Sequence, residues 1–364
     1  MNARTPIRDG FPAGLPVRLG GPAAWYGPAL MTQGGWIEPL SPAELDELAL
    51  AAAPHLARVE KNARALNLLA SADFPLPTLA RRLARMRDEL LDGRGFALLR
   101  GLPVARWGAR LSAVAFYGLG LHIGRPRTQN AQGHLLGHVR DLGLRSDDPT
   151  VRIYQTHERQ TFHTDSADVV GLLCLQPAKA GGLSALVSSV TIYNELRERR
   201  PELACLLFEP LATDRRGEVP PGAAPYFAIP VFNWHANTLS AMYQRQYIDS
   251  AQRFAGAPRL TPAHVEALDL FDALADDPAL HLTMALEPGD IQFVHNHALL
   301  HDRTAFEDFP DPTRRRHLLR LWLAPLEARS LPPVFAQRYG SVVAGARGGI
   351  ALTGAAGVMP LPEA

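Results

Sequence analysis

From about residue 150 onward, short apolar runs alternate with turns that are rich in proline and glycine. Runs of this length, bounded by turn residues, are typical of the strands of a sandwich or barrel. Helical patterns interrupt them at about 190–209 and 240–275. The sequence therefore predicts a β-sandwich core that is decorated by helices.

Three further segments extend this sandwich. The stretch LTMALEPGDIQFVHNHALLHDRTAFED predicts two strands joined by a tight Pro-Gly-Asp turn at 288–290, and RRRHLLRLWLAP predicts another strand. Upstream, glycines bound the apolar run at 96–99, which predicts a buried strand.

Before these strands, the chain is helical. Ser41 can cap a helix, Pro42 suits its first position and Glu44 completes a capping box, so we expect a helix from 42 to about 66. A second helix is expected at about 78–92.

Composition favours a small-molecule role. The 364 residues include 37 basic and 36 acidic residues, so no net field argues for nucleic acid or an anionic membrane as a partner. No apolar leader or membrane-length segment is apparent, and we expect a cytoplasmic protein. Cys174 and Cys205 are far apart in apolar settings, which predicts buried core residues rather than a disulfide. Association of identical chains stays open.

The first candidate for chemistry is the pair His163 and Asp165 in FHTD. On an extended backbone, residues i and i+2 point the same way, so both side chains can reach one ion. Two histidines and one carboxylate on one face of a metal suit oxygen-activating ferrous iron. The spacing alone also fits an ordinary surface turn.

A second histidine cluster supplies candidates for the missing ligand. His295, His297 and His301 follow the Pro-Gly-Asp turn within an apolar segment. Any one of them could be the third ligand, and the residues alone leave the choice open.

Two arginines on the last predicted strand indicate a binding site for a negatively charged ligand. Alternation along this strand directs Arg316, Leu318 and Arg320 to one face. Because a guanidinium binds a carboxylate through two parallel hydrogen bonds, inward arginines suit a dicarboxylate cosubstrate. We expect Arg314 and Arg315 to lie in a solvated turn.

Four segments in this order, FHTD, AKAGGLSALVSS, LEPGDIQFVHNHALLHDRTAFED and RRRHLLRLWL, carry a family resemblance. The chain resembles the Fe(II)- and 2-oxoglutarate-dependent dioxygenases of the TauD/TfdA type, in the clavaminate synthase-like superfamily. The resemblance covers roughly residues 90–325. It implies an α+β fold with a double-stranded β-helix (jelly-roll) core at 91–330. Residues 1–90 would then form an N-terminal extension with helices packed on that core, and 331–364 a C-terminal tail lying loosely on the surface.

The resemblance also implies a ligand set. His163 and Asp165 would be the near ligands and His301 the distal one. Asn296 matches an asparagine commonly found before the distal ligand. His297 would then line the pocket, and His295 likewise.

Cosubstrate roles follow from the same matches. Ser184 and Arg316 would hold the far carboxylate of 2-oxoglutarate. Arg320 matches a second arginine that in some members meets an anionic substrate. The resemblance implies Fe(II), 2-oxoglutarate and O2 as cofactors and cosubstrates, with release of succinate and CO2.

The substrate itself is not named by the sequence. Two rival classes are a non-redox cupin-like metalloenzyme and a metal-binding relative without catalysis. A small, anionic substrate fits Arg320. Further candidates for the substrate pocket are Tyr154, Gln155, His157, Tyr226, Phe227 and His297.

Overall fold

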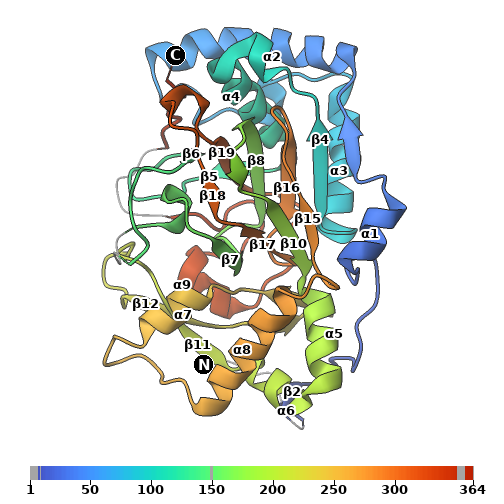
Figure 1. The fold of residues 1–364 in the computed structure, drawn as a ribbon, viewed down its shortest axis with the longest axis vertical. Coiled ribbons are helices and arrows are strands. Elements are labelled where there is room, and N and C mark those ends of the chain that lie inside the picture. Colours follow the sequence, from blue (N-terminus) through green and yellow to red (C-terminus); the bar gives the residue numbers. More distant parts are fainter. Residues whose placement is uncertain (1–6, 9, 148–150, 351–356, 364) are drawn as a thin grey trace.

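A computed structural model describes residues 7–8, 10–147, 151–350 and 357–363 (Figure 1). Its larger sheet runs in the order β3 (Ile37–Pro39), β4 (Phe96–Arg100), β16 (Ile291–His295), β8 (Val169–Gln176), β19 (His317–Ala324) and β5 (Arg125–Arg127), with β6 (Leu136–Val139) also paired to β19. All pairs are antiparallel except β3 with β4. The buried strand expected at 96–99 is β4.

A smaller sheet faces the larger one across the core. Its order is β15 (Leu282–Met284), β10 (Ser184–Ser188), β17 (Leu299–Arg303) and β7 (Gln160–His163). The two sheets form the predicted jelly-roll core of an α+β protein. The two strands expected around the Pro-Gly-Asp turn are β15 and β16, but the same segment also contains β17, because the chain turns again at 296–298. That second turn moves the chain from β16 in the larger sheet to β17 in the smaller one.

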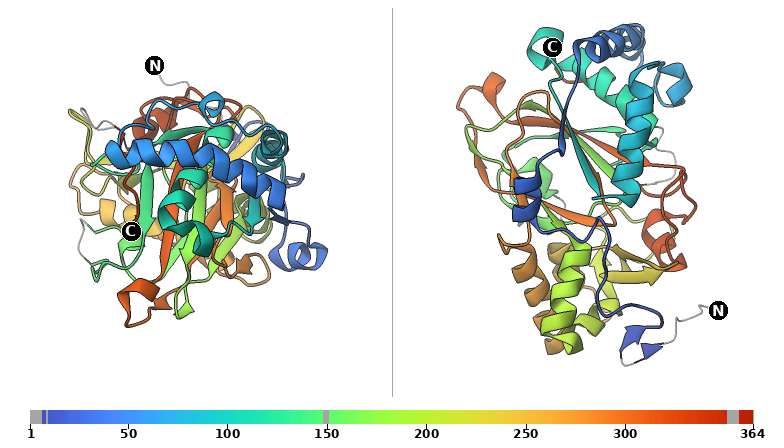
Figure 2. Two further views of the ribbon diagram at one scale, coloured as in Figure 1. Left: turned by 90° about the horizontal axis from the view of Figure 1, so that it is seen from above. Right: turned by 90° about the vertical axis from the view of Figure 1, so that its right-hand side faces the viewer.

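Three helices cover the outer face of the larger sheet (Figures 1 and 2). They are α2 (Pro42–Lys61), α3 (Leu79–Asp92) and α4 (Val104–Ile123). The predicted capping box is present, because the Glu44 amide donates to Ser41 Oγ and the Ser41 amide donates to Glu44 Oε2. Helix α2 ends five residues before the expected position, where the chain enters turns. Buried leucines and phenylalanines from these helices and from the larger sheet form one continuous core.

A second apolar core lies beyond the smaller sheet. It is built by α5 (Ser189–Arg199), α6 (Pro201–Ala204), α7 (Arg245–Ala251) and α8 (Pro262–Ala275), with the hairpins β11 (Pro210–Asp214)–β12 (Tyr226–Pro230) and β13 (Phe232–His235)–β14 (Thr238–Ala241). The helical pattern expected from the sequence at about 240–275 is therefore not one continuous helix. A strand ends at Ala241, and a turn containing Gly256 and Pro258 separates α7 from α8.

The remaining regular elements are short. They are β1 (Ile7–Arg8), β2 (Phe11–Pro12), α1 (Gly27–Gln33), β9 (Ala180–Gly181), β18 (Phe306–Glu307) and α9 (Ala336–Tyr339). Among the helices that the structure describes, none combines the length and apolar character needed to cross a bilayer.

The expectation of a loose C-terminal tail is wrong for its described residues. Phe335, Arg347 and Met359 are almost fully buried. Residues 351–356 and 364 lie outside the described part. Both cysteines are free, but only Cys174 is buried, whereas Cys205 is partly exposed.

Gly289 has no room for a side chain. It adopts φ +88°, its amide donates to the carbonyl of Cys174 at 2.8 Å, and an added Cβ would lie 2.0 Å from the Leu102 carbonyl oxygen. The Pro-Gly-Asp turn therefore needs glycine both for its backbone angle and for the close approach of another chain segment.

Replacing Gly289 with alanine should lower the free energy of unfolding by about 3 kcal/mol or more, because the backbone must move. Gly143 is a matched control, since its φ is +71° but no described atom lies within 4 Å of an added Cβ. Gly143→Ala should cost only about 1–2 kcal/mol, from the positive φ. Equal losses in denaturant unfolding would contradict this interpretation of the turn.

Candidate active site

Two facing strands bring the predicted metal ligands together. His163 ends β7 and pairs directly with His301 in β17, so the ring centroids are 4.1 Å apart. Asp165 follows two residues after His163 and lies 3.9 Å from the Nε2 atom of each histidine. One ligand atom from each residue lies within 4.8 Å of the other two, and no other described group of histidine, cysteine or acidic side chains converges in this way.

The protonation states suit a divalent cation. Burial lowers the pKa of His163, and burial together with the neighbouring His163 lowers the pKa of His301 to about 3. Burial opposes ionisation of Asp165, but Arg320 and the two histidines outweigh it and lower its pKa to about 2. Two neutral imidazoles and one carboxylate are the form that metal binding requires.

The orientation of each donor also fits an ion. The Nδ1 atom of His163 lies 2.8 Å from the Thr161 carbonyl oxygen, so it carries the proton and Nε2 keeps its lone pair. Gln160 donates to this lone pair at 2.8 Å, so a metal bound by His163 would replace that hydrogen bond. Ligand atoms about 2.1 Å from one ion lie about 3–4 Å apart, which is close to the observed spacing. These residues therefore fit an iron ion on chemical and geometric grounds.

Asp165 is held by neighbours that leave one of its oxygens available. Arg320 Nη1 donates to Asp165 Oδ2 at 3.1 Å, and Trp322 Nε1 donates to the same oxygen at 2.9 Å. Arg320 Nε is bound to Gln129, and its guanidinium lies 4.7 Å from the centre of the Tyr154 ring. Oδ1 keeps its lone pairs for a metal.

A cavity of about 480 Å³, including its mouth, lies beside the candidate metal ligands. We call it the smaller cavity. His163 and His301 line one part of it, and Ser184, Arg316, Leu318 and Arg320 line another. The predicted common face of residues 316, 318 and 320 is therefore present.

Two guanidinium groups in the smaller cavity lack an anion. Arg316 Nη1 and Arg303 Nε and Nη1 are buried without hydrogen-bond partners among the described residues, and no described acidic side chain forms an ion pair with either arginine. Burial lowers the pKa of Arg316 to about 10, and burial with the neighbouring Arg316 lowers that of Arg303 to about 9. Ser184 Oγ lies 3.4 Å from Gln292. A carboxylate would satisfy these donors.

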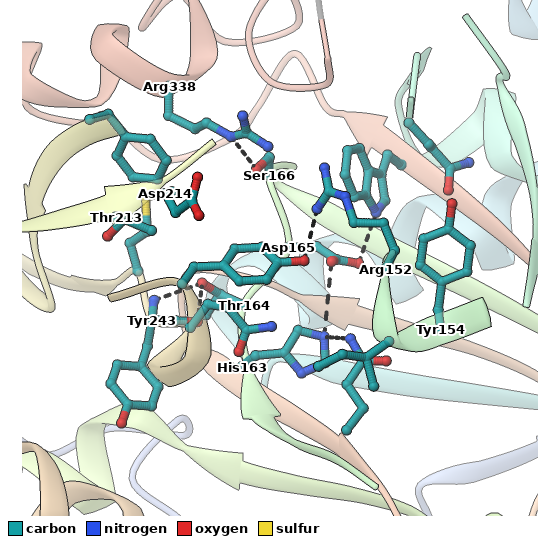
Figure 3. A pocket seen from close by; sticks show the side chains of 18 of the residues that line it. Arg152, Tyr154, His163, Thr164, Asp165, Ser166, Thr213, Asp214, Tyr243 and Arg338 are labelled. Carbon is teal, nitrogen blue, oxygen red and sulfur yellow. Dashed lines mark hydrogen bonds and ion pairs between the residues drawn. The ribbon is translucent and has the colours of Figure 1, made fainter. Parts of the chain in front are cut away.

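A larger cavity of about 660 Å³ is lined by Asp165 (Figure 3), and it shares His163 and Arg320 with the smaller cavity. Of the predicted substrate residues, Tyr154, Phe227 and Arg320 line it. Gln155 instead lines a groove beyond Tyr154. His157 is paired with Asp141, and Tyr226 OH donates to Gly256, so neither lines a cavity at the metal ligands.

His297 lies in a separate buried network. Its Nε2 atom is 2.9 Å from Asp168 Oδ1, and its ring packs edge-on against Phe335 and Tyr339. It lines neither the larger nor the smaller cavity. His295 Nδ1 is 3.2 Å from Arg329 Nη2 in the same network. His295 and His297 therefore do not converge with His163, Asp165 and His301.

Sequence reasoning missed three arginines of the site: Arg303, Arg152 and Arg338. A signal for Arg338 exists, because residues 329–362 contain three arginines and no acidic residue. Such a segment must find its anions elsewhere in the fold or in a ligand.

Residues 61–322 match the family described as Taurine catabolism dioxygenase TauD, TfdA family. The chain belongs to this family. It is therefore an Fe(II)- and 2-oxoglutarate-dependent dioxygenase, as expected from the sequence, and the family's chemistry uses O2 as the second cosubstrate.

Known relatives agree with this assignment. FR-33289 synthase of Streptomyces rubellomurinus is 37% identical over 262 residues, which cover 71% of this chain and 77% of that protein. A uridine-5'-phosphate dioxygenase from an Amycolatopsis species is 30% identical over 245 residues, covering 63% of this chain and 85% of that one. An asparagine oxygenase solved with Fe(II), 3-hydroxyasparagine and succinate has the same fold, with a TM-score of 0.59 at 20% identity over 79% of this chain and 93% of that chain.

Removing a ligand histidine should abolish stable iron binding. Wild-type protein should retain about one Fe(II) per chain after dialysis, as three protein donors allow, whereas His163→Ala and His301→Ala should retain little. His295→Ala and His297→Ala are controls from the same histidine cluster and should bind iron normally, provided that circular dichroism shows them folded. Loss of iron in either control with retention in His301→Ala would assign the third ligand differently.

Proposed function

We propose that the enzyme hydroxylates a small anionic molecule, with iron held by His163, Asp165 and His301 and 2-oxoglutarate held in the smaller cavity. The observation that carries this proposal is a pair of buried guanidinium groups, those of Arg303 and Arg316, in the cavity that His163 and His301 also line. Neither forms an ion pair with a described acidic side chain, and each has buried N–H groups without a described hydrogen-bond partner. Isolated buried cations are costly, so this cavity is suited to a carboxylate ligand.

Each side chain then has a distinct task. Arg316 would bind the far carboxylate of 2-oxoglutarate, with Ser184 donating a hydrogen bond and Arg303 adding a second cation. When bound, Fe(II) supplies the oxidising chemistry that turns 2-oxoglutarate and O2 into succinate and CO2. Arg320 and Trp322 fix the Asp165 carboxylate, which keeps one oxygen directed to the metal.

Retention of Asp165 favours hydroxylation. Family members that halogenate have a small residue at this position, which makes room for chloride, whereas this chain keeps the carboxylate. The larger cavity beside Asp165 would hold the substrate within reach of the metal.

An anionic substrate is supported by the cations around the larger cavity and by two relatives whose names specify uridine-5'-phosphate. The nearly balanced net charge supports a small-molecule substrate without nucleic acid or membrane partners. We infer a cytoplasmic location. The chain could act alone or as a homo-oligomer.

The proposal is tested by succinate formation. Iron-loaded protein should convert 2-oxoglutarate slowly to succinate, and small anions that are substrates should stimulate the reaction with matching product. Iron-loaded protein that forms no succinate with any anion of a broad panel would overturn the proposal.

Arg316 should control cosubstrate affinity without affecting the metal. Arg316→Ala leaves a buried carboxylate without its charged partner, so the 2-oxoglutarate concentration for half-maximal succinate release should rise about tenfold or more. Iron content should not change. Arg315→Ala removes the adjacent exposed arginine and should behave as wild type. An unchanged requirement in Arg316→Ala would transfer the role to Arg303 or Arg320.

A further inference from the structure

Two arginines from distant parts of the chain face the larger cavity and share one carboxylate. Arg152 precedes a short 3-10 helix, and Arg338 lies in α9 near the C-terminus. Their side chains are only 16% and 7% exposed. Arg152 forms an ion pair with Glu218, and Arg338 Nη2 lies 3.5 Å from the same Oε2 atom. Glu218 can therefore neutralise only one of the two guanidiniums.

A third arginine adds to this excess of positive charge. Arg215 is buried, and its hydrogen bonds to the described residues go to two main-chain carbonyls, those of Ala224 at 3.1 Å and Gln337 at 2.5 Å. Burial and the nearby Arg338 lower the pKa of Arg215 to about 10. Arg215 thus adds a third positive charge close to Arg338, which already shares one carboxylate with Arg152.

The two described aspartates that line the larger cavity are already paired. Asp214 forms an ion pair with Arg253 at 2.6 Å and accepts a hydrogen bond from Ser250. Asp165 pairs with Arg320 and is one of the proposed metal ligands. Neither is free to compensate the arginine cluster, and a buried excess of positive charge favours an anionic ligand.

Neutral partners fix the two cavity arginines without cancelling their charge. Arg152 Nη1 donates to Tyr247 OH at 3.0 Å, and Arg338 Nε donates to Ser166 Oγ at 2.7 Å (Figure 3). The side-chain oxygen of Gln244, in the same cavity, is buried without a described partner. The site therefore combines oriented cationic donors with an acceptor for a hydroxyl or amine.

We propose that Arg152 and Arg338 bind a phosphate or phosphonate group of the substrate in the larger cavity. The inference rests on the proposed function, because it assigns this cavity to the substrate. A tetrahedral dianion would offset the excess positive charge of Arg152, Arg215 and Arg338 over Glu218, and it can accept hydrogen bonds from the guanidiniums of Arg152 and Arg338. The anion would bind on the side of Ser166, so the remainder of the substrate could extend toward Asp165 and the metal.

Inorganic phosphate is the direct probe of this site. Protein loaded with Mn(II) and 2-oxoglutarate should bind phosphate saturably in calorimetric titrations, since 2-oxoglutarate then occupies the other arginine site. Arg338→Gln and Arg152→Gln should each weaken phosphate binding by about tenfold or more. Arg338→Lys, which keeps the charge but loses the planar fork, should fall between wild type and Arg338→Gln.

A matched control removes a different arginine that also contacts the C-terminal segment. Arg127 Nε donates to the Gly348 carbonyl but does not line the cavity, so Arg127→Gln should bind phosphate as wild type does. All variants should keep their affinity for 2-oxoglutarate. No phosphate binding by wild type, displacement of 2-oxoglutarate by phosphate, or unchanged binding in folded Arg338→Gln and Arg152→Gln would overturn the proposal.

Measurements of succinate release distinguish a phosphate ester from a phosphonate as the substrate. Uridine 5'-phosphate and 2-aminoethylphosphonate represent phosphate esters and phosphonates, and stimulation of succinate release by one of them identifies the class. The stimulating compound should be required at a higher concentration in Arg338→Gln than in wild type or in Arg127→Gln. Stimulation by carboxylic acids alone would refute this anion site while leaving the dioxygenase function intact. Conversely, phosphate binding without any succinate release would support the site and refute the function.

Discussion

The buried amide of Asn296 joins the two halves of the candidate metal site. Its Oδ1 atom accepts a hydrogen bond from the Asp165 amide at 2.7 Å, and its Nδ2 atom donates to the carbonyls of Asp165 and Ala167. Asn296 begins the turn from β16 to β17, the strand that carries His301. One side chain therefore fixes the loop of Asp165 relative to the strand of His301. Buried amide groups are stable only when satisfied, and this network gives the loop one arrangement.

The C-terminal segment holds the same loop from its other side. Arg338 binds Ser166, and Arg347 forms an ion pair with the fully buried Asp168 at 2.9 Å. Arg347 also donates to the main chain at Arg329, which closes the segment on itself. The loop after His163 is thus fixed between the β16–β17 turn and the C-terminal segment. Because breaking a buried pair leaves an uncompensated charge, we attribute to this segment a part in the shape of the active site.

Much of the metal and cosubstrate site could be predicted from sequence, because its geometry is local or follows strand alternation. The two-residue spacing of His163 and Asp165 and the common face of Arg316 and Arg320 are properties of extended backbone. The residues alone could not choose among the three later histidines, since that choice depends on the turn that separates β16 from β17. Family resemblance supplied the choice of His301.

The substrate side was poorly predicted for a physical reason. Arg152 and Arg338 are 186 positions apart and meet only through folding of the C-terminal segment over the core. That segment is rich in small residues and has no clear periodicity, so it was expected to be loose. The available signal was that residues 329–362 contain three arginines but no aspartate or glutamate. Because the side chains of Arg338 and Arg347 are buried, they need negatively charged partners from outside this segment. His297 was assigned to the pocket, but its pairing with Asp168 could not be seen without the fold.

The most direct test of the account is a crystal structure of the protein grown without oxygen in the presence of Fe(II) and 2-oxoglutarate, with anomalous scattering recorded at the iron edge. The account predicts one iron peak bonded to His163, Asp165 and His301. It also predicts 2-oxoglutarate chelating that iron, with its far carboxylate against Ser184 and Arg316. An iron peak at His295 or His297, or 2-oxoglutarate bound away from Arg316, would contradict it.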